Sequence, residues 1–221
     1  MALERETVLR TALRLLDEVG LDGLSLRRLA KELGVQAPAL YWHFTNKQDL
    51  LDHLAVFARQ EAGVSLGVTP EAGQAWDEWL AGGMRMMRRG MLTHRDGARL
   101  AAGNRPVREA WPDIERTLSV LVEAGFEPAD AIRAVLVLGH FVSGFVLDEQ
   151  RGSEREDDPM PALDPAEFPI LAAGGAAALD QDTLFEYGLQ RMLDGMRAQL
   201  ATHEESAADG SGGELPDGTR A

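Results

Sequence analysis

The apolar residues of this chain recur every three or four positions, and no stretch alternates apolar and polar residues with a period of two. The C-terminal part shows the repeat most clearly, in an apolar stripe that consists of Phe185, Leu189, Met192, Leu193, Met196 and Leu200. Such spacing places side chains on one face of an α-helix, whereas a half-buried strand needs alternation. The sequence therefore predicts an all-α protein.

The charge of the chain is unevenly distributed. The 221 residues carry a formal net charge of −14, yet residues 1–59 hold eight basic and eight acidic groups and are neutral. The remaining residues carry the whole deficit. This length accommodates a small module joined to a larger domain, and the asymmetry indicates a small N-terminal module with one partner and an acidic body with another role.

Several protein classes are excluded or disfavoured by composition. The absence of cysteine excludes disulfides and thiolate metal sites. The first residues carry charges and no apolar segment of the kind found in secretory signals. The longest apolar run, residues 134–147, is too short to span a bilayer and indicates a buried helix. We expect a cytoplasmic protein without membrane contact.

Start and stop signals divide the N-terminal module into four short helices. Ser25 and Asn46 are suited to cap the second and fourth helices. Gly34 is suited to end the second helix, because the turn there needs a positive φ. Pro38 fits the first turn of the third helix. Two short helices joined at Gly34 have the pattern of a helix-turn-helix.

The segment GVQAPALYWHFTNK, residues 34–47, places four ring side chains in a row. Four adjacent rings cannot all face one core, so some of them face outward. One interpretation is a hydrophobic patch for another protein. The flanking cations, Arg27, Arg28, Lys31 and Lys47, favour a surface for nucleic-acid phosphates instead.

The stretch GLDGLSLRRLAKELGVQAPALYWHFTNKQDLLDHLA resembles the DNA-binding domain of the TetR family. The segments RDGARL, GNRP, EAGF and GHFVSGFVLDEQ are similar to segments of the tetracycline repressor branch, so the resemblance covers about residues 3–150. It implies a homodimer of helical subunits, a head that binds a DNA operator, and a ligand pocket whose occupation releases the DNA.

The resemblance sets the expected organisation of the chain. We expect a DNA-binding head with a three-helix helix-turn-helix fold at residues 1–47, a larger helical ligand-binding and dimerisation domain at 48–202, and a disordered acidic tail at 203–221. Dimerisation is expected through helices at about 128–151 and 182–200, with Leu193 and Met196 in the interface.

In this resemblance Leu40 and Phe44 turn inward, and the rings between them face the DNA. Arg27 matches a position that reads guanine, and Lys47 resembles a phosphate clamp. Small apolar side chains at the start of the third helix suit thymine methyl groups. The residues assigned to DNA binding are Arg27, Arg28, Ala37, Pro38, Ala39, Tyr41, Trp42, His43 and Lys47. Tetracycline repressors carry glutamine where Ala37 stands, so their operator sequence does not transfer.

The expected pocket departs from that of the tetracycline repressors. They hold a magnesium–tetracycline chelate through a histidine at the position of Ala101, and alanine offers no ligand atom. Asp148 keeps a carboxylate, yet one carboxylate makes a poor metal site. We therefore expect a mostly apolar small-molecule effector with no metal and no cofactor. The residues expected to bind it are Met87, Asn104, Arg105, Trp111, Ile114, Thr117, Val135, Phe141 and Asp148. For the methionines, plain core packing remains an open alternative.

Two other function classes fit the sequence less well. An enzyme is disfavoured, because the sequence shows no nucleophile–base pair, no glycine-rich phosphate loop and no histidine–carboxylate cluster at metal spacing. A ligand-independent DNA-binding protein would usually be basic and would not need so large a body. The sequence therefore predicts a dimeric, ligand-responsive transcriptional repressor; the alternative is a repressor of an efflux gene that responds to a tetracycline-like drug.

Overall fold

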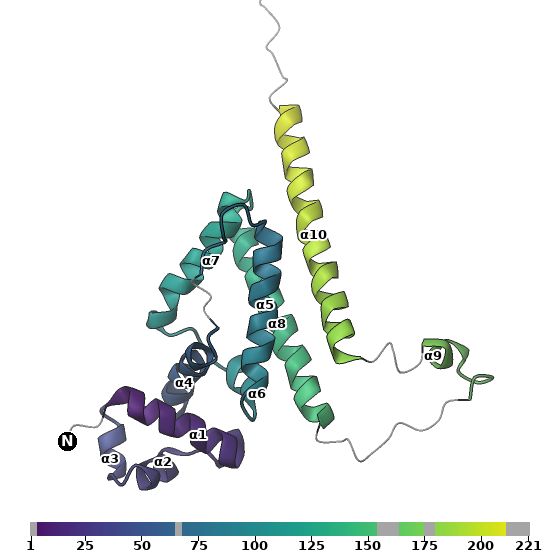
Figure 1. Cartoon of the computed structure of the whole chain (residues 1–221). Coiled ribbons are helices and arrows are strands. Elements are labelled where there is room, and N and C mark those ends of the chain that lie inside the picture. The colour runs from purple at the N-terminus through teal and green to yellow at the C-terminus, as the bar shows by residue number, and fades with distance from the viewer. Residues whose placement is uncertain (1–3, 65–67, 154–163, 175–179, 211–221) are drawn as a thin grey trace, which may run out of the picture.

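The computed structural model describes residues 4–64, 68–153, 164–174 and 180–210, and this part of the chain contains helices and no strand (Figure 1). The predicted all-α class is confirmed. The elements are α1 (Arg5–Gly23), α2 (Leu26–Glu32), α3 (Ala37–Leu40), α4 (Lys47–Glu61), α5 (Trp76–Leu92), α6 (Gly97–Ala102), a 3-10 turn (Arg108–Ala110), α7 (Trp111–Glu123), α8 (Pro128–Ser153), α9 (Pro169–Gly174) and α10 (Gln181–Gly210).

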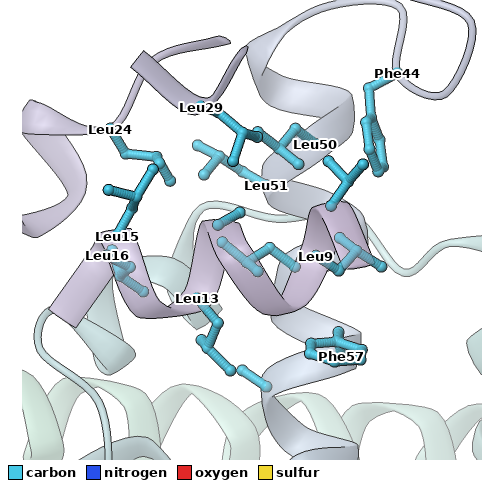
Figure 2. Packing of buried hydrophobic residues seen from close by; sticks show 14 of the residues in the cluster. Leu9, Leu13, Leu15, Leu16, Leu24, Leu29, Phe44, Leu50, Leu51 and Phe57 are labelled. Carbon is cyan, nitrogen blue, oxygen red and sulfur yellow. The ribbon is translucent and has the colours of Figure 1, made fainter. Parts of the chain in front are cut away.

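Helices α1 to α4 form a small head around one apolar cluster (Figure 2). Leu9 and Leu16 from α1 face Leu50 and Leu54 from α4, and Phe44 closes the cluster beside α3. All five side chains are almost fully buried. Because α4 contributes to this cluster along most of its length, the core of the head extends beyond residue 47, where sequence analysis placed the domain boundary.

The start and stop signals of the head occupy the predicted places. Ser25 Oγ accepts a hydrogen bond from the Arg28 backbone N–H at 3.2 Å, and Asn46 Oδ1 accepts one from that of Asp49 at 3.0 Å. Gly34 has a φ of 67°, which a residue without Cβ adopts at little cost. The caps start α2 and α4, and the turn at Gly34 joins α2 to α3.

The first helix bends at Gly20 and does not end there. The backbone there has φ 71° and ψ 174°, and helical hydrogen bonding then resumes as far as Gly23. A Cβ at Gly20 would lie 2.8 Å from Asp96 Oδ2, which belongs to the segment before α6. Glycine at this position therefore permits both the bend and the close approach of α6.

The larger domain is built around α8. Helices α5, α6, α7 and α10 all pack against it. Its second apolar cluster includes Leu80, Leu121, Leu138, Phe185 and Leu189. By length and composition alone α8 could cross a membrane, but a single such helix is weak evidence for this, and four helices of the same domain pack against α8.

Two expectations for the C-terminal part are corrected by the structure. Helix α10 continues to Gly210, so residues 203–210 are helical and not disordered; residues 211–221 lie outside the described part. Leu193 and Met196 are buried against the core of their own protomer, because α10 packs on α8 and α5 with this face. They are therefore not available as a dimer surface.

Candidate DNA-binding surface and ligand cavity

The ring cluster at α3 divides as the resemblance implied. Leu40 and Phe44 are buried in the head, whereas Tyr41 is 55% and Trp42 90% exposed. His43 is half-buried, with its ring 6.3 Å from that of Phe44. No core contact accounts for a tryptophan held so far into solvent, and this surface can offer a phenol and an indole N–H to a partner.

Cationic and small side chains surround these rings. Arg27 and Arg28 are exposed on α2, and Pro38 is exposed between the half-buried Ala37 and Ala39. Lys47 is half-buried, because its Nζ donates to the Leu21 carbonyl oxygen at 3.0 Å. An ammonium group has three N–H donors, so two of them remain for another acceptor such as a phosphate. The role of each residue in DNA binding stays a prediction.

A cavity of about 340 Å³ lies where α4, α5, α6, α7 and α8 meet. This is within the size range of small-molecule sites. Its wall is mainly apolar, and the residues that line it are Asp52, Ala55, Val56, Ala58, Arg59, Val64, Met87, Gly90, Met91, His94, Gly97, Leu100, Ala101, Asn104, Arg105, Pro106, Ala110, Ile114, Leu118, Ile132, Val135 and Leu136.

Five of the residues expected to bind the effector lie in this wall: Met87, Asn104, Arg105, Ile114 and Val135. The position that distinguishes the chain from the tetracycline repressors, Ala101, also lies there. A methyl group therefore faces the space where those proteins were expected to place a metal ligand.

The other four expected residues lie away from the cavity wall. Trp111 is 57% exposed, and its ring is near the Arg108 guanidinium. The Thr117 hydroxyl is buried and donates to the Asp113 carbonyl oxygen at 3.0 Å. Phe141 stacks on Phe185 in the core, with ring centroids 5.5 Å apart. Asp148 is exposed. For these residues the structure does not support a contact with a ligand in this cavity.

Sequence analysis missed the contribution of α4 to the cavity. Ala55, Val56 and Arg59 line it from this helix, and Ile132 and Leu136 line it from α8. A signal was present, since α4 carries apolar residues on more faces than the head alone can bury. Arg59 gave no such signal, because an arginine near the end of a helix usually lies on the surface.

The Asn104 side chain is already engaged by the protein. Its Nδ2 donates to the carbonyl oxygens of Leu100 and Leu51, and its Oδ1 accepts from Gln48 Nε2 at 2.8 Å. The Arg105 N–H approaches Asp52 Oδ1 at 3.4 Å. These hydrogen bonds hold the segment after α6 against α4. Because the Asn104 amide is used in them, its first role is to connect these two elements and not to bind a ligand.

The segment before α6 is fastened to α1. His94 Nδ1 lies 3.0 Å from Asp17 Oδ2, and Asp96 Oδ2 accepts from the Leu21 N–H at 2.7 Å. Arg99 pairs with Asp22 at 3.0 Å, and its guanidinium lowers the pKa of that carboxyl. Helix α6 therefore lines the cavity and is bound to the head at both ends.

Comparison with known proteins places these features in a family context. A family model described as bacterial regulatory proteins, tetR family, matches residues 8–54. A second one, described as tetracyclin repressor-like, C-terminal domain, matches residues 69–200.

Individual relatives are similar over most of their length. The chain is 41% identical over 200 residues to the class A tetracycline repressor protein from transposon 1721 of Escherichia coli, which covers 88% of this chain and 90% of that protein. The crystal structure of the Streptomyces coelicolor TetR family protein ActR in complex with (S)-DNPA matches with a TM-score of 0.76 at 31% identity, over 90% of this chain and 99% of that one. A class A TetR in complex with 5a,6-anhydrotetracycline and magnesium matches with a TM-score of 0.69 at 38% identity, over 89% and 99% of the two chains.

Proposed function

Because this chain belongs to the TetR family of ligand-responsive, DNA-binding transcriptional repressors, which are not enzymes, we propose that two copies of it bind a palindromic operator and leave it when a small, mostly apolar effector enters the cavity. The protein acts in the cytoplasm, where its DNA lies, and uses no cofactor.

The observation that carries this proposal is the path of α4. Its first residue, Lys47, lies beside the exposed ring cluster, and Arg59 lines the cavity from its last turn. The two sites are therefore joined by a single helix of 15 residues. An effector that shifts α4 or α6 displaces the head, and both ends of α6 are bound to the head as well.

Exposed apolar side chains support the homodimer. Val137 on α8 and Leu184 and Tyr187 on α10 remain exposed in the protomer. Helix α9 buries none of its side chains, and Ile170 is 86% exposed. A second copy that covers the faces of α8 and α10 would remove such surface from water. Two heads held in this way would meet successive half-sites of an operator.

An effector without metal is favoured by the composition of the cavity wall. Ala101 contributes a methyl group, and in the part of the chain that the structure describes no three His, Asp or Glu side chains are grouped to hold a metal ion. Met87 and Met91 provide a wall that adapts to flat or bulky ligands. A tetracycline with magnesium is the second candidate, because a class A tetracycline repressor is 41% identical to this chain.

The DNA-binding half of the proposal can be tested by selecting binding sites from random duplex DNA. We expect a palindrome, with Arg27→Ala relaxing the preference at one base pair per half-site at a cost of about 1–3 kcal/mol. Lys47→Ala should weaken binding to all sequences and reduce the salt slope by about one unit. An unchanged base preference in Arg27→Ala would show that Arg27 does not read the operator.

The effector half can be tested by a gel-shift titration on the selected operator. Diverse apolar aromatic compounds are added with and without a chelator, beside a tetracycline–magnesium control. We expect release by at least one compound in the presence of the chelator. If tetracycline with magnesium were the one compound that releases the DNA, and the chelator abolished this release, the second candidate would be established instead.

A further inference from the structure

Arg59 is the cationic side chain of α4 that lines the cavity. Its Nη2 is buried and has no hydrogen-bond partner, which among the described side chains is true of one other nitrogen, Arg5 Nε. The exposed arginines that line or flank the wall, Arg105 and Arg108, have access to water. A buried guanidinium nitrogen without a hydrogen-bond acceptor costs free energy. A ligand that supplies an acceptor to Nη2 would remove this cost.

Among the residues that the structure describes, no carboxylate accepts a hydrogen bond from Arg59 Nη2. The nearest electrostatic influence is Asp113 on α7, whose carboxylate is engaged by Arg116 at 2.5 Å. Asp113 is not among the lining residues, and the carboxylate that is, Asp52, accepts from Gln48 Nε2 at 2.9 Å. Burial lowers the pKa of Arg59, although an arginine side chain stays protonated in proteins. A full positive charge thus stands at a mainly apolar wall, where Nη2 has no hydrogen-bond acceptor and Asp113 acts on the charge through its electrostatic field.

We propose, on the basis of the sensor function inferred above, that the effector carries a carboxylate on an apolar ring system and that this carboxylate pairs with Arg59. The wall around Arg59 is apolar, with Val56, Val64 and Ile114 among its members, and suits the rings. The guanidinium fork matches a carboxylate in two parallel hydrogen bonds, and its flexible stem lets these donors turn toward a ligand. The preferred ligand class is therefore an aromatic or polycyclic carboxylic acid in its ionised form.

The test compares matched probes on the full-length protein. Benzoate, naphthalene-2-carboxylate and anthracene-2-carboxylate are each titrated beside the neutral primary carboxamide of the same ring system, with binding followed by calorimetry. In the wild type we expect the best carboxylate to bind about ten- to a hundredfold more tightly than its carboxamide, the size of a hydrogen bond to a charged group. Arg59→Met should remove this preference and leave carboxamide binding intact. Arg89→Met, which changes an exposed arginine of α5 outside the cavity wall, should keep it.

A second measurement guards against a variant that fails to bind because it fails to fold. Without ligand, Arg59→Met should unfold at the same or a higher temperature than the wild type, because it removes a half-buried guanidinium whose Nη2 has no hydrogen-bond partner. Lower thermal stability would mean that Arg59 already has a structural partner and would overturn the proposal.

The remaining outcomes separate this inference from the function on which it rests. Equal binding of carboxylates and carboxamides to the wild type, or a preference that survives in Arg59→Met, overturns the assignment of Arg59 alone. Failure of every probe of both kinds to bind would argue against the cavity as an effector site and so against the proposed sensor.

Discussion

At the scale of single residues, burial separates neighbours with similar chemistry. Trp42 and Phe44 lie two positions apart, yet one is 90% exposed and the other is buried in the head. The sequence indicated that adjacent rings could not share one core. Family resemblance then assigned the directions, and the structure agrees. Arg59 is the opposite case, because nothing in its sequence context distinguishes it from a surface arginine.

The contrast between the two rings gives a direct test. We expect Trp42→Ala to leave the free energy of unfolding nearly unchanged and to weaken operator binding, since the indole contacts little of its own protein. Phe44→Ala should lower the free energy of unfolding by about 3–5 kcal/mol, because it empties a packed site in the core. Urea unfolding and gel shifts on both variants measure these effects. A Trp42→Ala protein with full operator affinity would remove the ring from the DNA-binding surface.

At the scale of elements, the short helices were predictable and the faces of the long ones were not. Ser25, Gly34 and Asn46 act locally, through caps and a turn, so the sequence alone placed α2 and α4. Helix α8 is apolar on nearly every side, and periodicity cannot tell which side meets the cavity. Of the two residues expected to bind the effector from this helix, Val135 lines the cavity and Phe141 packs on Phe185 instead. Tertiary packing decides such cases.

Helix α6 depends on Asp96 for its junction with the head. Asp96 has a φ of 57°, and its carboxylate accepts from the Leu21 N–H just beyond the bend in α1. Asp96→Gly keeps the backbone conformation and leaves this N–H without its acceptor, at a cost of about 1–2 kcal/mol. We expect faster hydrogen exchange at Leu21. In Asp96→Asn, which retains an acceptor oxygen, exchange should stay close to that of the wild type. Equal exchange in all three proteins would mean that this bond does not hold α1 to α6.

The junction of α5 and α10 predicts a pH dependence of stability. Arg85 Nε and Nη2 each donate to Glu186 at 2.6 Å, and this pairing lowers the pKa of Glu186. A carboxylate with a lower pKa in the folded state stabilises the fold above its unfolded pKa, and this contribution is lost as the pH falls through the folded value. We expect the melting temperature of Glu186→Gln to fall less steeply than that of the wild type below about pH 5. Parallel curves would show that solvent screens the pair completely.

At the scale of the whole molecule, the neutral head and the acidic body are suited to different partners. The large negative charge of the body disfavours contact between DNA and any part of the protein outside the head. The uncharged surface of the body includes exposed apolar side chains on α8 and α10. Sequence analysis expected the interface on these two helices, which stays a prediction, and it chose a face of α10 that is buried in the protomer. The stripe that contains Leu193 and Met196 is the more continuous apolar face of α10, and it packs into the core of the protomer.

The exposed faces provide the corrected test of dimerisation. We expect the double variant Val137→Glu and Leu184→Glu to be a folded monomer with much weaker operator binding, because pairing of half-sites needs two heads. Val122→Glu, at an exposed position on α7, serves as the matched control and should remain dimeric. Sedimentation at micromolar concentration distinguishes these states. A wild-type protein that sediments as a monomer would contradict the homodimer.

The path of α4 has a consequence for the dose at which genes are switched on. In the proposed mechanism α4 couples the two sites, and because such coupling is reciprocal, the factor by which effector weakens operator binding equals the factor by which operator weakens effector binding. Copies of the protein bound to DNA then have a lower affinity for the effector than free copies, so the free copies bind effector first. A surplus of free protein raises the effector concentration needed for induction, whereas extra operators at a fixed amount of protein draw copies away from the regulated gene and lower it. The induction threshold is therefore a property of gene copy number and expression level as much as of the cavity.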